Sequence, residues 1–384
     1  DVKKIMELHN QTEKELGIKA DSLVALQEEL QQLLTGISML KELTKRTRDY
    51  LVSFGERMSV RLMAAYLKKE GLTADYFDSW DIGFVSDSNY MSAELDDCVW
   101  QTIPEHLNDY KNGKSDVIPI VTGFIAKDKA GHITTLGRGG SDLSATMIGS
   151  AMQAEEIQTW KDVDGILTAD PRICPEAKPV SEVTYEEAQE LAVFGSQVLH
   201  PRSMVPCIKS GTPVRVKNSY NIQSPGSIIV AKHSAKPNRV CAITSVKHVT
   251  LIDIVSTRML GAAGFLAHIF NQFLKWNISI DVVATSEVSV SLTINTDADI
   301  SGLLEDLKKV ADVEVKQEKA IIAIICDVGS TSSILADGFK ALNENGINVQ
   351  MISQGASKVN ISFICDDCQS KDVVKILHKA YFGA

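Results

Sequence analysis

The chain has 384 residues, of which 44% are hydrophobic and 23% are charged, and its formal net charge is −10. This is the composition of an ordinary globular protein with room for about two or three domains. The acidic balance and the lack of a basic run exclude nucleic acid and anionic membrane as partners. No apolar run approaches the roughly 18 residues of a membrane span.

The seven cysteines are scattered along the chain, and only Cys365 and Cys368 form a CxxC pair. Neither a second pair nor a histidine stands at the spacing typical of a zinc site. We therefore expect free thiols in a reducing compartment and no metal held by protein ligands.

The first 70 residues predict helices. Asp21 and Ser22 offer an N-cap, and leucines with helical spacing follow them. A second helix is expected at about residues 58–69, with Gly71 as its C-cap.

From residue 74 to residue 230, short apolar runs alternate with helical patterns. This alternation predicts a mostly parallel sheet with helices on both faces. The segment 221–236, which is rich in Ser, Pro and Lys, is expected to be a boundary. The expected strands include residues 118–125, 156–160 and 213–216, and the expected helices are residues 143–152 and 184–194.

Beyond that boundary the sequence repeats itself at an offset of 69 residues. Residues 249–294 follow the order strand, loop, helix, strand, turn, strand, and residues 320–365 follow the same order. Each α/β repeat is too small to bury much core alone, so we expect the two to pack together. An extra strand at 240–246 fits either repeat.

The segment 134–145, TTLGRGGSDLSA, places three glycines around one arginine just before a predicted helix. Glycines here let backbone N–H groups approach an anion, and the planar guanidinium of Arg138 suits a carboxylate or a phosphate. Asp142 is placed to cap the helix or to reach an ammonium group or a metal. Such a segment is often only a turn, and its spacing fits neither the dinucleotide fingerprint nor the Walker loop.

Three other segments each favour a structural role when taken alone. Residues 53–59, SFGERMS, place an acid at the start of the predicted helix, where it is as often a dipole partner as a ligand. Residues 160–172, WKDVDGILTADPR, follow a strand and contain an acidic turn. Residues 195–201, GSQVLHP, end a helix, and a histidine before proline is more often structural than catalytic.

In this order, and followed by the repeats, these segments resemble aspartate kinase of the amino-acid kinase family. The stretches 213–221 and 351–364 are most similar to monofunctional plant or algal enzymes. The resemblance implies an α/β fold: a three-layer αβα kinase domain at 1–232 with a mostly parallel sheet, followed by two ferredoxin-like (βαββαβ) ACT domains. The ACT domains are expected at 249–318 and at 240–248 together with 319–384.

The resemblance implies phosphoryl transfer from MgATP to the side-chain carboxylate of L-aspartate, which gives 4-phospho-L-aspartate. This reaction is the first step of lysine, threonine, methionine and isoleucine biosynthesis. The attacking carboxylate is already ionised near pH 7, so no general base and no Ser or Cys nucleophile is needed. Catalysis then consists of positioning two anions and neutralising the charge on the transferred group.

The family's roles carry over to this chain residue by residue. Arg138 is implied to clamp a substrate carboxylate, and Glu56 to accept a hydrogen bond from the α-ammonium. Asp142 is implied to place the substrate or to hold the helix start, and Gly139 and Gly140 to leave room for the phosphate. The residues implied to contact ATP are Lys161, Asp162, Leu167, Arg172 and Gln197.

Two departures from the family's pattern qualify these roles. The family opens with a strand carrying Lys-Phe-Gly-Gly, whose lysine spans the ATP phosphates, and this sequence has no such segment. We therefore expect these 384 residues alone to phosphorylate aspartate very poorly, and full turnover would contradict that. Bacterial relatives have Lys where Gln197 stands and Tyr where Leu167 stands, which leaves the adenine contacts open.

The resemblance also implies feedback inhibition, with lysine bound at the first ACT domain across a homo-oligomer interface. A helix start at Gly264 favours the effector carboxylate, and Asp281 or Glu287 favours its cationic groups. The apolar members of the set also fit a plain core, but Asp281 in a strand does not, since a buried unpaired carboxylate is costly. The expected effector residues are Met259, Gly264, Phe265, Leu266, Ser279, Ile280, Asp281, Thr285, Ser286 and Glu287.

Several alternatives stay open at this point. The effector is lysine, threonine or S-adenosylmethionine, and the compartment is the plastid stroma for a plant-like enzyme or the cytoplasm for a bacterial one. A catalytically impaired amino-acid sensor is a second candidate function because the lysine segment is missing. Other kinases of this fold, which act on carbamate, glutamate or uridylate, lack this set of motifs.

Overall fold

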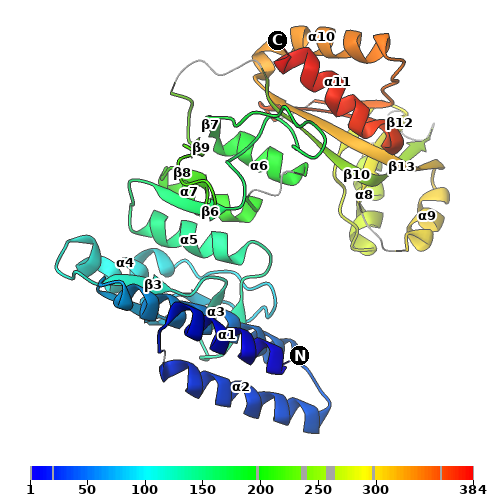
Figure 1. Cartoon of the computed structure of the whole chain (residues 1–384). Coiled ribbons are helices and arrows are strands. Elements are labelled where there is room, and N and C mark those ends of the chain that lie inside the picture. The colour runs from blue at the N-terminus through cyan, green and yellow to red at the C-terminus, as the bar shows by residue number, and fades with distance from the viewer. Residues whose placement is uncertain are drawn as a thin grey trace. The chain divides into compact units, whose positions relative to one another are not determined.

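The computed structural model describes residues 2–19, 21–195, 199–234, 240–256, 264–295, 299–354 and 357–383. The chain forms two compact units (Figure 1). The first unit comprises Asp1–Thr159 and Leu199–Arg215, and the second comprises Trp160–Val198 and Val216–Ala384. No helix in the described ranges is long and apolar enough to cross a membrane.

The first unit begins with the expected helices, α1 (Val2–Leu16), α2 (Asp21–Leu40) and α3 (Lys45–Lys69). The leucine stripe of α2 packs against Phe54 and Met58 of α3. The expected start of the second helix near residue 58 is wrong, because Thr44 caps α3 and accepts a hydrogen bond from the Thr47 N–H. Glu56 therefore lies in the middle of a helix. Burial of Phe54 and Met58 outweighs the roughly 1 kcal/mol cost of a glycine inside a helix.

The remaining strands of the first unit form small sheets. β1 pairs with β3 in parallel, β2 pairs with β4 in parallel, and β4 pairs with β5 in antiparallel fashion. The expected single strand at 118–125 is wrong, because it is interrupted before Phe124, whose φ of 68° does not belong to a strand. The bounds are β1 Ala74–Phe77, β2 Val85–Ser86, β3 Ile118–Val121, β4 Ile125–Asp128 and β5 Ile133–Thr135.

Helices α4 (Val99–Lys111) and α5 (Gly140–Ala151) share one core with the segment that follows β1. Helix α5 begins three residues before the expected start at 143. A short 3-10 helix (Pro201–Met204) and α7 (Val205–Ser210) pack against α5. Because α5 begins at Gly140, the Gly-rich segment continues directly into its first turn.

A further sheet has the strand order β6-β8-β9-β7, in which β7 and β9 are parallel. Helix α6 (Tyr185–Val193) follows β7 and begins with a capping box between Thr184 and Glu187, close to the expected start at 184. The strands are β6 Ile157–Lys161, β7 Glu182–Thr184, β8 Val214–Asn218 and β9 Ser227–Val230.

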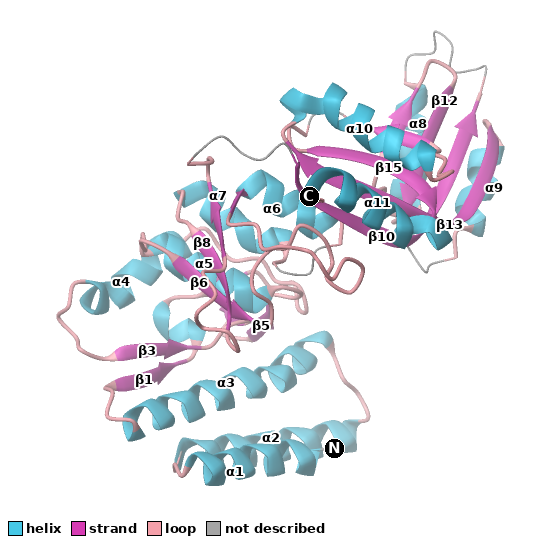
Figure 2. Cartoon of the chain, turned by 45° about the horizontal axis from the view of Figure 1, so that its top comes forward, coloured by secondary structure: helices cyan, strands magenta, loops and turns pink. Residues whose placement is uncertain are grey.

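The C-terminal part of the second unit is an antiparallel sheet with the order β11-β12-β10-β13-β15-β14 (Figure 2). β10 (Val240–Val255) pairs with β13 (Asp312–Cys326) along most of its length. The expected extra strand at 240–246 is therefore the first half of β10. The other strands are β11 Val283–Thr285, β12 Ser289–Ile294, β14 Met351–Ser353 and β15 Asn360–Asp366.

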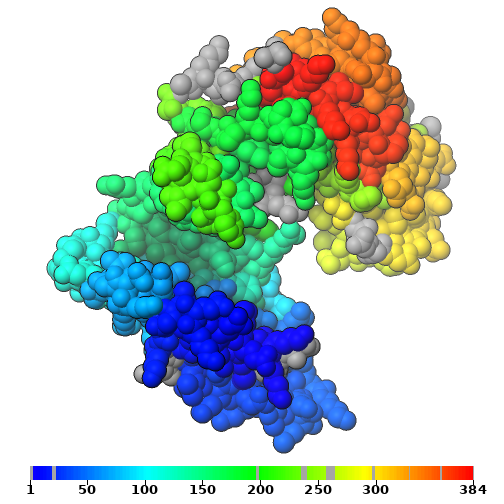
Figure 3. Space-filling view, in the orientation of Figure 1, coloured from blue at the N-terminus to red at the C-terminus, as the bar shows by residue number. Residues whose placement is uncertain are grey.

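Helices α8 (Phe265–Lys275) and α9 (Ser301–Lys308) cover the half of this sheet formed by β11, β12 and the second half of β10. Helices α10 (Thr331–Glu344) and α11 (Ser370–Phe382) cover the other half and form the orange and red surface in Figure 3. The first half of β10 is the fourth strand of the part of the sheet that α10 and α11 cover. The pattern is βαββαβ twice, as the resemblance implied, while the domain boundaries at 249–318 and at 240–248 with 319–384 stay a prediction.

Candidate active site

The Gly-rich turn joins β5 to α5 in a conformation that glycine alone fits. Gly139 is the N-cap of α5 and has a φ of 72°, in the left-handed region. A Cβ atom on Gly139 would lie 2.3 Å from Cβ of His200, and one on Gly140 would lie 2.8 Å from the ring of Phe124. Since neither Gly139 nor Gly140 has a side chain, the backbone at the start of α5 is not covered by side chains of these two residues.

Arg138 projects from this turn as an available cation. Its side chain is exposed, and within the described ranges it has no hydrogen-bond or ion-pair partner. Burial and the charges of Arg138 and Arg202 lower the pKa of His200, and Asp142 of the first turn of α5 opposes that effect. The structure thus brings His200 of the VLHP segment next to the GRGGSD segment.

Arg202, which sequence analysis did not single out, fixes the approach to the turn. Its guanidinium donates hydrogen bonds to the carbonyl oxygens of Leu136 at 2.7 Å and Ala93 at 2.6 Å. Both acceptors are neutral backbone carbonyl oxygens. The two hydrogen bonds therefore fix the position of the guanidinium and do not neutralise its charge. Arg202 directly follows the VLHP segment in the sequence. This position next to a motif is the one sequence signal that could have pointed to Arg202.

Asp49 ties α3 to β5. Its carboxylate is fully buried and accepts hydrogen bonds from Thr135 N at 3.0 Å, Thr135 Oγ1 at 2.8 Å and Met91 N at 2.9 Å. Glu56 follows Asp49 by seven residues, close to two helical turns, so both lie on the same face of α3. Sequence analysis missed Asp49, because a single acid inside a helical pattern carries no spacing signal.

Glu56 is half-buried, and burial raises the pKa of its carboxyl above the ordinary value. It has no hydrogen-bond or ion-pair partner in the part of the chain that the structure describes. A desolvated carboxylate without a partner gains strongly from a cation. Glu56 is therefore suited to accept a hydrogen bond from a bound ammonium group.

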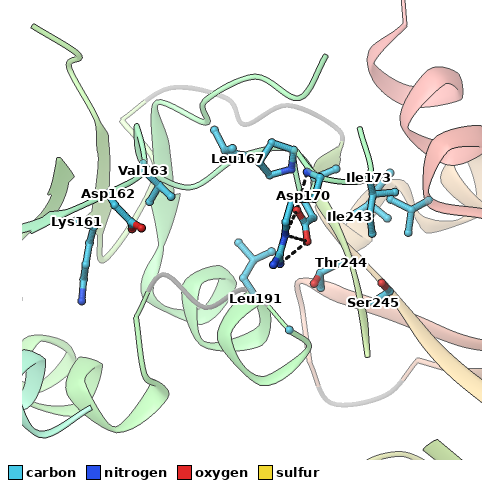
Figure 4. A pocket seen from close by; sticks show the side chains of 16 residues that line it. Lys161, Asp162, Val163, Leu167, Asp170, Ile173, Leu191, Ile243, Thr244 and Ser245 are labelled. Carbon is cyan, nitrogen blue, oxygen red and sulfur yellow. Dashed lines mark hydrogen bonds and ion pairs between the residues drawn. The ribbon is translucent and has the colours of Figure 1, made fainter. Parts of the chain in front are cut away.

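The second unit contains a separate cavity of about 440 Å³, shown in Figure 4. Lys161 and Asp162 lie at one end of it, and Thr244 and Ser245 of β10 lie at the other. The cavity brings together four of the five residues predicted to contact ATP: Lys161, Asp162, Leu167 and Arg172. The fifth, Gln197, lies outside the described residues.

The acidic turn beside this cavity is fixed by the strands that follow it. Gly165 has a φ of 122°, and a Cβ atom there would lie 2.5 Å from Oγ of Ser227. Asp164 accepts hydrogen bonds from the side-chain amides of Asn218 at 2.9 Å and Asn221 at 3.1 Å. The segment 213–221 therefore serves to hold the DVDG turn in place.

Arg172 lines the cavity and forms an ion pair with Asp170 of its own loop. Its Nη2 atom donates to Asp170 at 2.8 Å, and its Nε atom donates to the same carboxylate at 3.0 Å. The pair is largely exposed, and the guanidinium beside it lowers the pKa of Asp170. An exposed pair of this kind contributes little to stability, so Arg172 can exchange Asp170 for an anionic ligand at small cost.

The predicted effector residues that the structure describes lie at the start of α8 and on both sides of β11. Gly264 is the N-cap of α8, as expected, and Phe265 is half-buried against the core while Leu266 is exposed. The prediction that Asp281 lies in a strand is wrong, because β11 begins at Val283. The other described members are Ser279, Ile280, Thr285, Ser286 and Glu287; Met259 lies outside the described residues.

Asp281 keeps an exposed surface, yet desolvation raises the pKa of its carboxyl to about 6. Its backbone N–H donates to the carbonyl oxygen of Thr293 at 2.9 Å, which fixes the segment before β11 beside β12. Within the described ranges its carboxylate has no partner, in contrast to Asp253 and Asp306, which pair with lysines. Asp281 therefore resembles a ligand group more than a structural one.

Comparison with known proteins agrees with this arrangement. Residues 6–218 match the Amino acid kinase family, and residues 325–381 match an ACT domain. The chain is 48% identical over 389 residues to Aspartokinase 1, chloroplastic, of Arabidopsis thaliana, covering 98% of this chain and 68% of that protein. The chain belongs to the amino acid kinase family, and within it to the aspartokinases.

Two solved structures of Escherichia coli aspartokinase III are similar to this chain. The R-state complex with aspartate and ADP has a TM-score of 0.81 at 30% identity and covers 99% of this chain and 86% of that chain. The T-state complex with lysine and aspartate has a TM-score of 0.75 at 33% identity and covers 93% of this chain and 82% of that chain. The expected fold, an α/β kinase domain with ACT modules, is confirmed.

Proposed function

We infer that this chain is an aspartate kinase, which transfers a phosphoryl group from MgATP to the side-chain carboxylate of L-aspartate and so forms 4-phospho-L-aspartate. The observation that carries the inference is Arg138, an exposed guanidinium without a described partner, on a glycine turn that enters α5. The similar E. coli structure that holds aspartate and ADP supports the choice of substrates.

In this function Arg138 clamps a carboxylate of aspartate with its two parallel N–H groups. Glu56 accepts a hydrogen bond from the α-ammonium, and Asp142 places the substrate or holds the start of α5. Gly139 and Gly140 leave room for the transferred phosphate. Orientation of this kind accounts for much of the rate enhancement when the nucleophile is already ionised.

The cavity of the second unit is the proposed nucleotide site. Lys161 offers a cation to the phosphates, Asp162 and Leu167 contact the nucleoside, and Arg172 offers a second cation. Gln197 is proposed for the same site on resemblance alone. Mg²⁺ arrives with the nucleotide and neutralises part of its charge.

The decisive test is ADP release by the full-length protein with aspartate and MgATP. We expect release that depends on aspartate, with glutamate as the control that lengthens the carbon chain while keeping both carboxylates. ATP binding without any aspartate-dependent release would favour an amino-acid sensor with an impaired kinase domain. Release driven equally by glutamate would favour another kinase of this fold.

We propose lysine as the feedback effector, because the T-state E. coli structure holds lysine and this chain has a desolvated carboxylate at Asp281. The effector carboxylate is proposed to bind at the start of α8, where backbone N–H groups are free of intrahelical partners. A homo-oligomer formed through the ACT modules is proposed from the resemblance. Threonine and S-adenosylmethionine are the alternatives to be titrated in the same assay.

Replacing Asp281 with alanine should raise the lysine concentration for half-inhibition at least roughly tenfold, since a partly desolvated ionic contact to the effector is lost. The measurement is inhibition of each variant relative to its own uninhibited rate. Asp299, which hydrogen-bonds only to Ser301 in the described ranges, provides the control Asp299→Ala. Unchanged lysine sensitivity of Asp281→Ala would exclude this site.

Lysine inhibition should weaken as the pH falls through about 6, because desolvation raises the pKa of Asp281 to about 6. Below that value the carboxyl is neutral and no longer attracts an ammonium group; above it the carboxylate is fully charged. The raised pKa also means that the carboxylate, which is charged above about pH 6, destabilises the fold in the absence of effector, and that this cost is lost as the pH falls toward the ordinary pKa of aspartate. Half-inhibition measured from pH 7.5 to 5.5 should shift in the wild type and stay flat in Asp281→Asn.

We propose the plastid stroma as the compartment, on the similarity to the chloroplastic Arabidopsis protein. A fluorescent fusion of the full-length protein, imaged against chlorophyll, tests the proposal. Uniform cytoplasmic fluorescence would contradict it.

A further inference from the structure

The loop that forms one wall of the proposed nucleotide cavity is held by the last helix of the chain. Leu167 and Ala169 both line the cavity, and Thr168 between them is buried and does not belong to the lining. Thr168 Oγ1 lies 2.9 Å from Nε2 of His378, which is on α11 and is also buried. The two residues are 210 positions apart, so the contact is purely tertiary.

Thr168 is the point at which four hydrogen bonds meet. Its carbonyl oxygen accepts from the N–H of Ile243 on β10 at 2.8 Å, and its N–H donates to the carbonyl oxygen of Lys178 at 2.9 Å. Its hydroxyl accepts from the N–H of Lys178 at 3.0 Å and so has its own proton available for His378. His378 is the one side chain among these partners.

Most side chains packed around this contact are apolar, and the charged groups that act on the His378 ring are Glu176 and Lys178. Ala169 and Cys174 of the loop belong to the same buried core as Leu377 of α11, and Ile173 packs against it. Val374, one turn before His378, itself lines the cavity. In such surroundings an unmade hydrogen bond is costly, so the pair fixes the position of the loop more firmly than the apolar contacts alone.

Burial also lowers the pKa of His378, which keeps its ring neutral near pH 7. A neutral imidazole has one nitrogen that accepts and one that donates, so its Nε2 atom can accept a hydrogen bond from the hydroxyl of Thr168. The ring also contacts Phe382, with a centroid distance of 4.9 Å and an angle of 38° between the ring planes.

We propose that His378 is a positioning residue for nucleotide binding, which acts through Thr168 to fix the wall of the cavity formed by Leu167 and Ala169. The proposal rests on the nucleotide role proposed for this cavity. It makes α11 of the ACT half a part of the framework of the nucleotide site. Nucleotide binding and the order of α11 are then coupled, and the coupling acts equally in both directions.

The test uses matched variants of the full-length protein. Thr168→Val removes the hydroxyl and keeps the shape, Thr168→Ser keeps the hydroxyl, and His378→Phe keeps a ring but no nitrogen. Ser370→Ala is the control, since it removes a buried hydrogen bond of α11 to Asp367 without touching the loop. The dissociation constant for ADP is read from the fluorescence of Trp160, which adjoins Lys161, and KM is measured for ATP and for aspartate.

We expect Thr168→Val and His378→Phe each to weaken ADP binding and to raise KM for ATP roughly tenfold, with KM for aspartate unchanged. The double variant should be no worse than Thr168→Val, because Thr168→Val already removes the His378 contact together with the hydrogen bond from the Lys178 N–H. Thr168→Ser should bind ADP within about twofold of wild type. In wild type, ADP should increase the hydrogen-exchange protection of α11, and in His378→Phe it should not.

Unchanged ADP binding in Thr168→Val and His378→Phe would overturn the inference, as would additive effects in the double variant. An equal loss in Ser370→Ala would also overturn it, since the effect would then follow general weakening of α11. Failure of the wild type to bind ADP at all would overturn the proposed nucleotide site, and this inference with it.

Discussion

Replacing Arg138 with alanine should lower kcat/KM for aspartate roughly 100- to 1,000-fold, as expected for the loss of a preorganised charged donor at a reacting anion. Arg138 is exposed and has no partner in the described part of the chain, so its removal leaves no buried group unpaired. The effect should therefore fall on the kinetics and not on folding. Initial-rate measurements with varied aspartate and with varied ATP separate the two substrates.

Arg138→Lys provides a sharper version of the same experiment. Lysine keeps the charge but offers a point donor instead of two parallel N–H groups, so most of the loss should persist. The control is Arg46→Ala. Arg46 is also a cation of the first unit, but it is far from Arg138 in the sequence, and its described hydrogen bond, to His132, is long. Wild-type kinetics in Arg138→Ala would exclude Arg138 from the substrate site.

Replacing Asp49 with alanine should lower the free energy of unfolding of the first unit by about 3 kcal/mol, because it leaves buried donors without an acceptor. The donors are the N–H groups of Met91 and Thr135 and the hydroxyl of Thr135. Since Asp49 joins α3 to β5, the loss should also raise KM for aspartate through the displaced Glu56. Hydrogen exchange of the α3 and β5 amides measures the change in stability locally.

Asp49→Asn keeps one carbonyl oxygen and should lose less stability than the alanine variant. Asp75→Ala is the matched control, because Asp75 is an exposed acid whose 3.4 Å pair with Lys68 is also exposed. Such a pair contributes less than about 1 kcal/mol. Equal exchange in Asp49→Ala and Asp75→Ala would show that Asp49 does not fix α3.

The turn before α5 could be predicted from sequence because its constraints are local. Glycines beside Arg138 and an acid three residues into a helix form a pattern that is visible over a short stretch. The start of α3 could not be predicted, because it depends on how Phe54 and Met58 pack against α2. Gly55 lowers the helix propensity at this point, and tertiary burial outweighs that cost.

The supports of the site are invisible in the sequence for a different reason. Arg202 reaches the carbonyl oxygen of Leu136, and Thr168 reaches His378, across 66 and 210 residues. No periodicity or spacing links such positions. Sequence patterns therefore predict candidate ligand-contacting residues, whereas the residues that hold those candidates in place become visible only in the structure.

β10 has a consequence for how this protein responds to stress. The strand is 16 residues long and pairs with β13 on both sides of the irregular register near His248. A domain joined by a loop can melt or be cut away while its neighbour survives, but two modules that share a strand cannot. Heat, denaturant or a protease should therefore remove both regulatory modules in one step. A destabilising substitution in the module that contains Asp281 should then also unfold the module that contains α11, the helix that contacts the wall of the proposed nucleotide cavity.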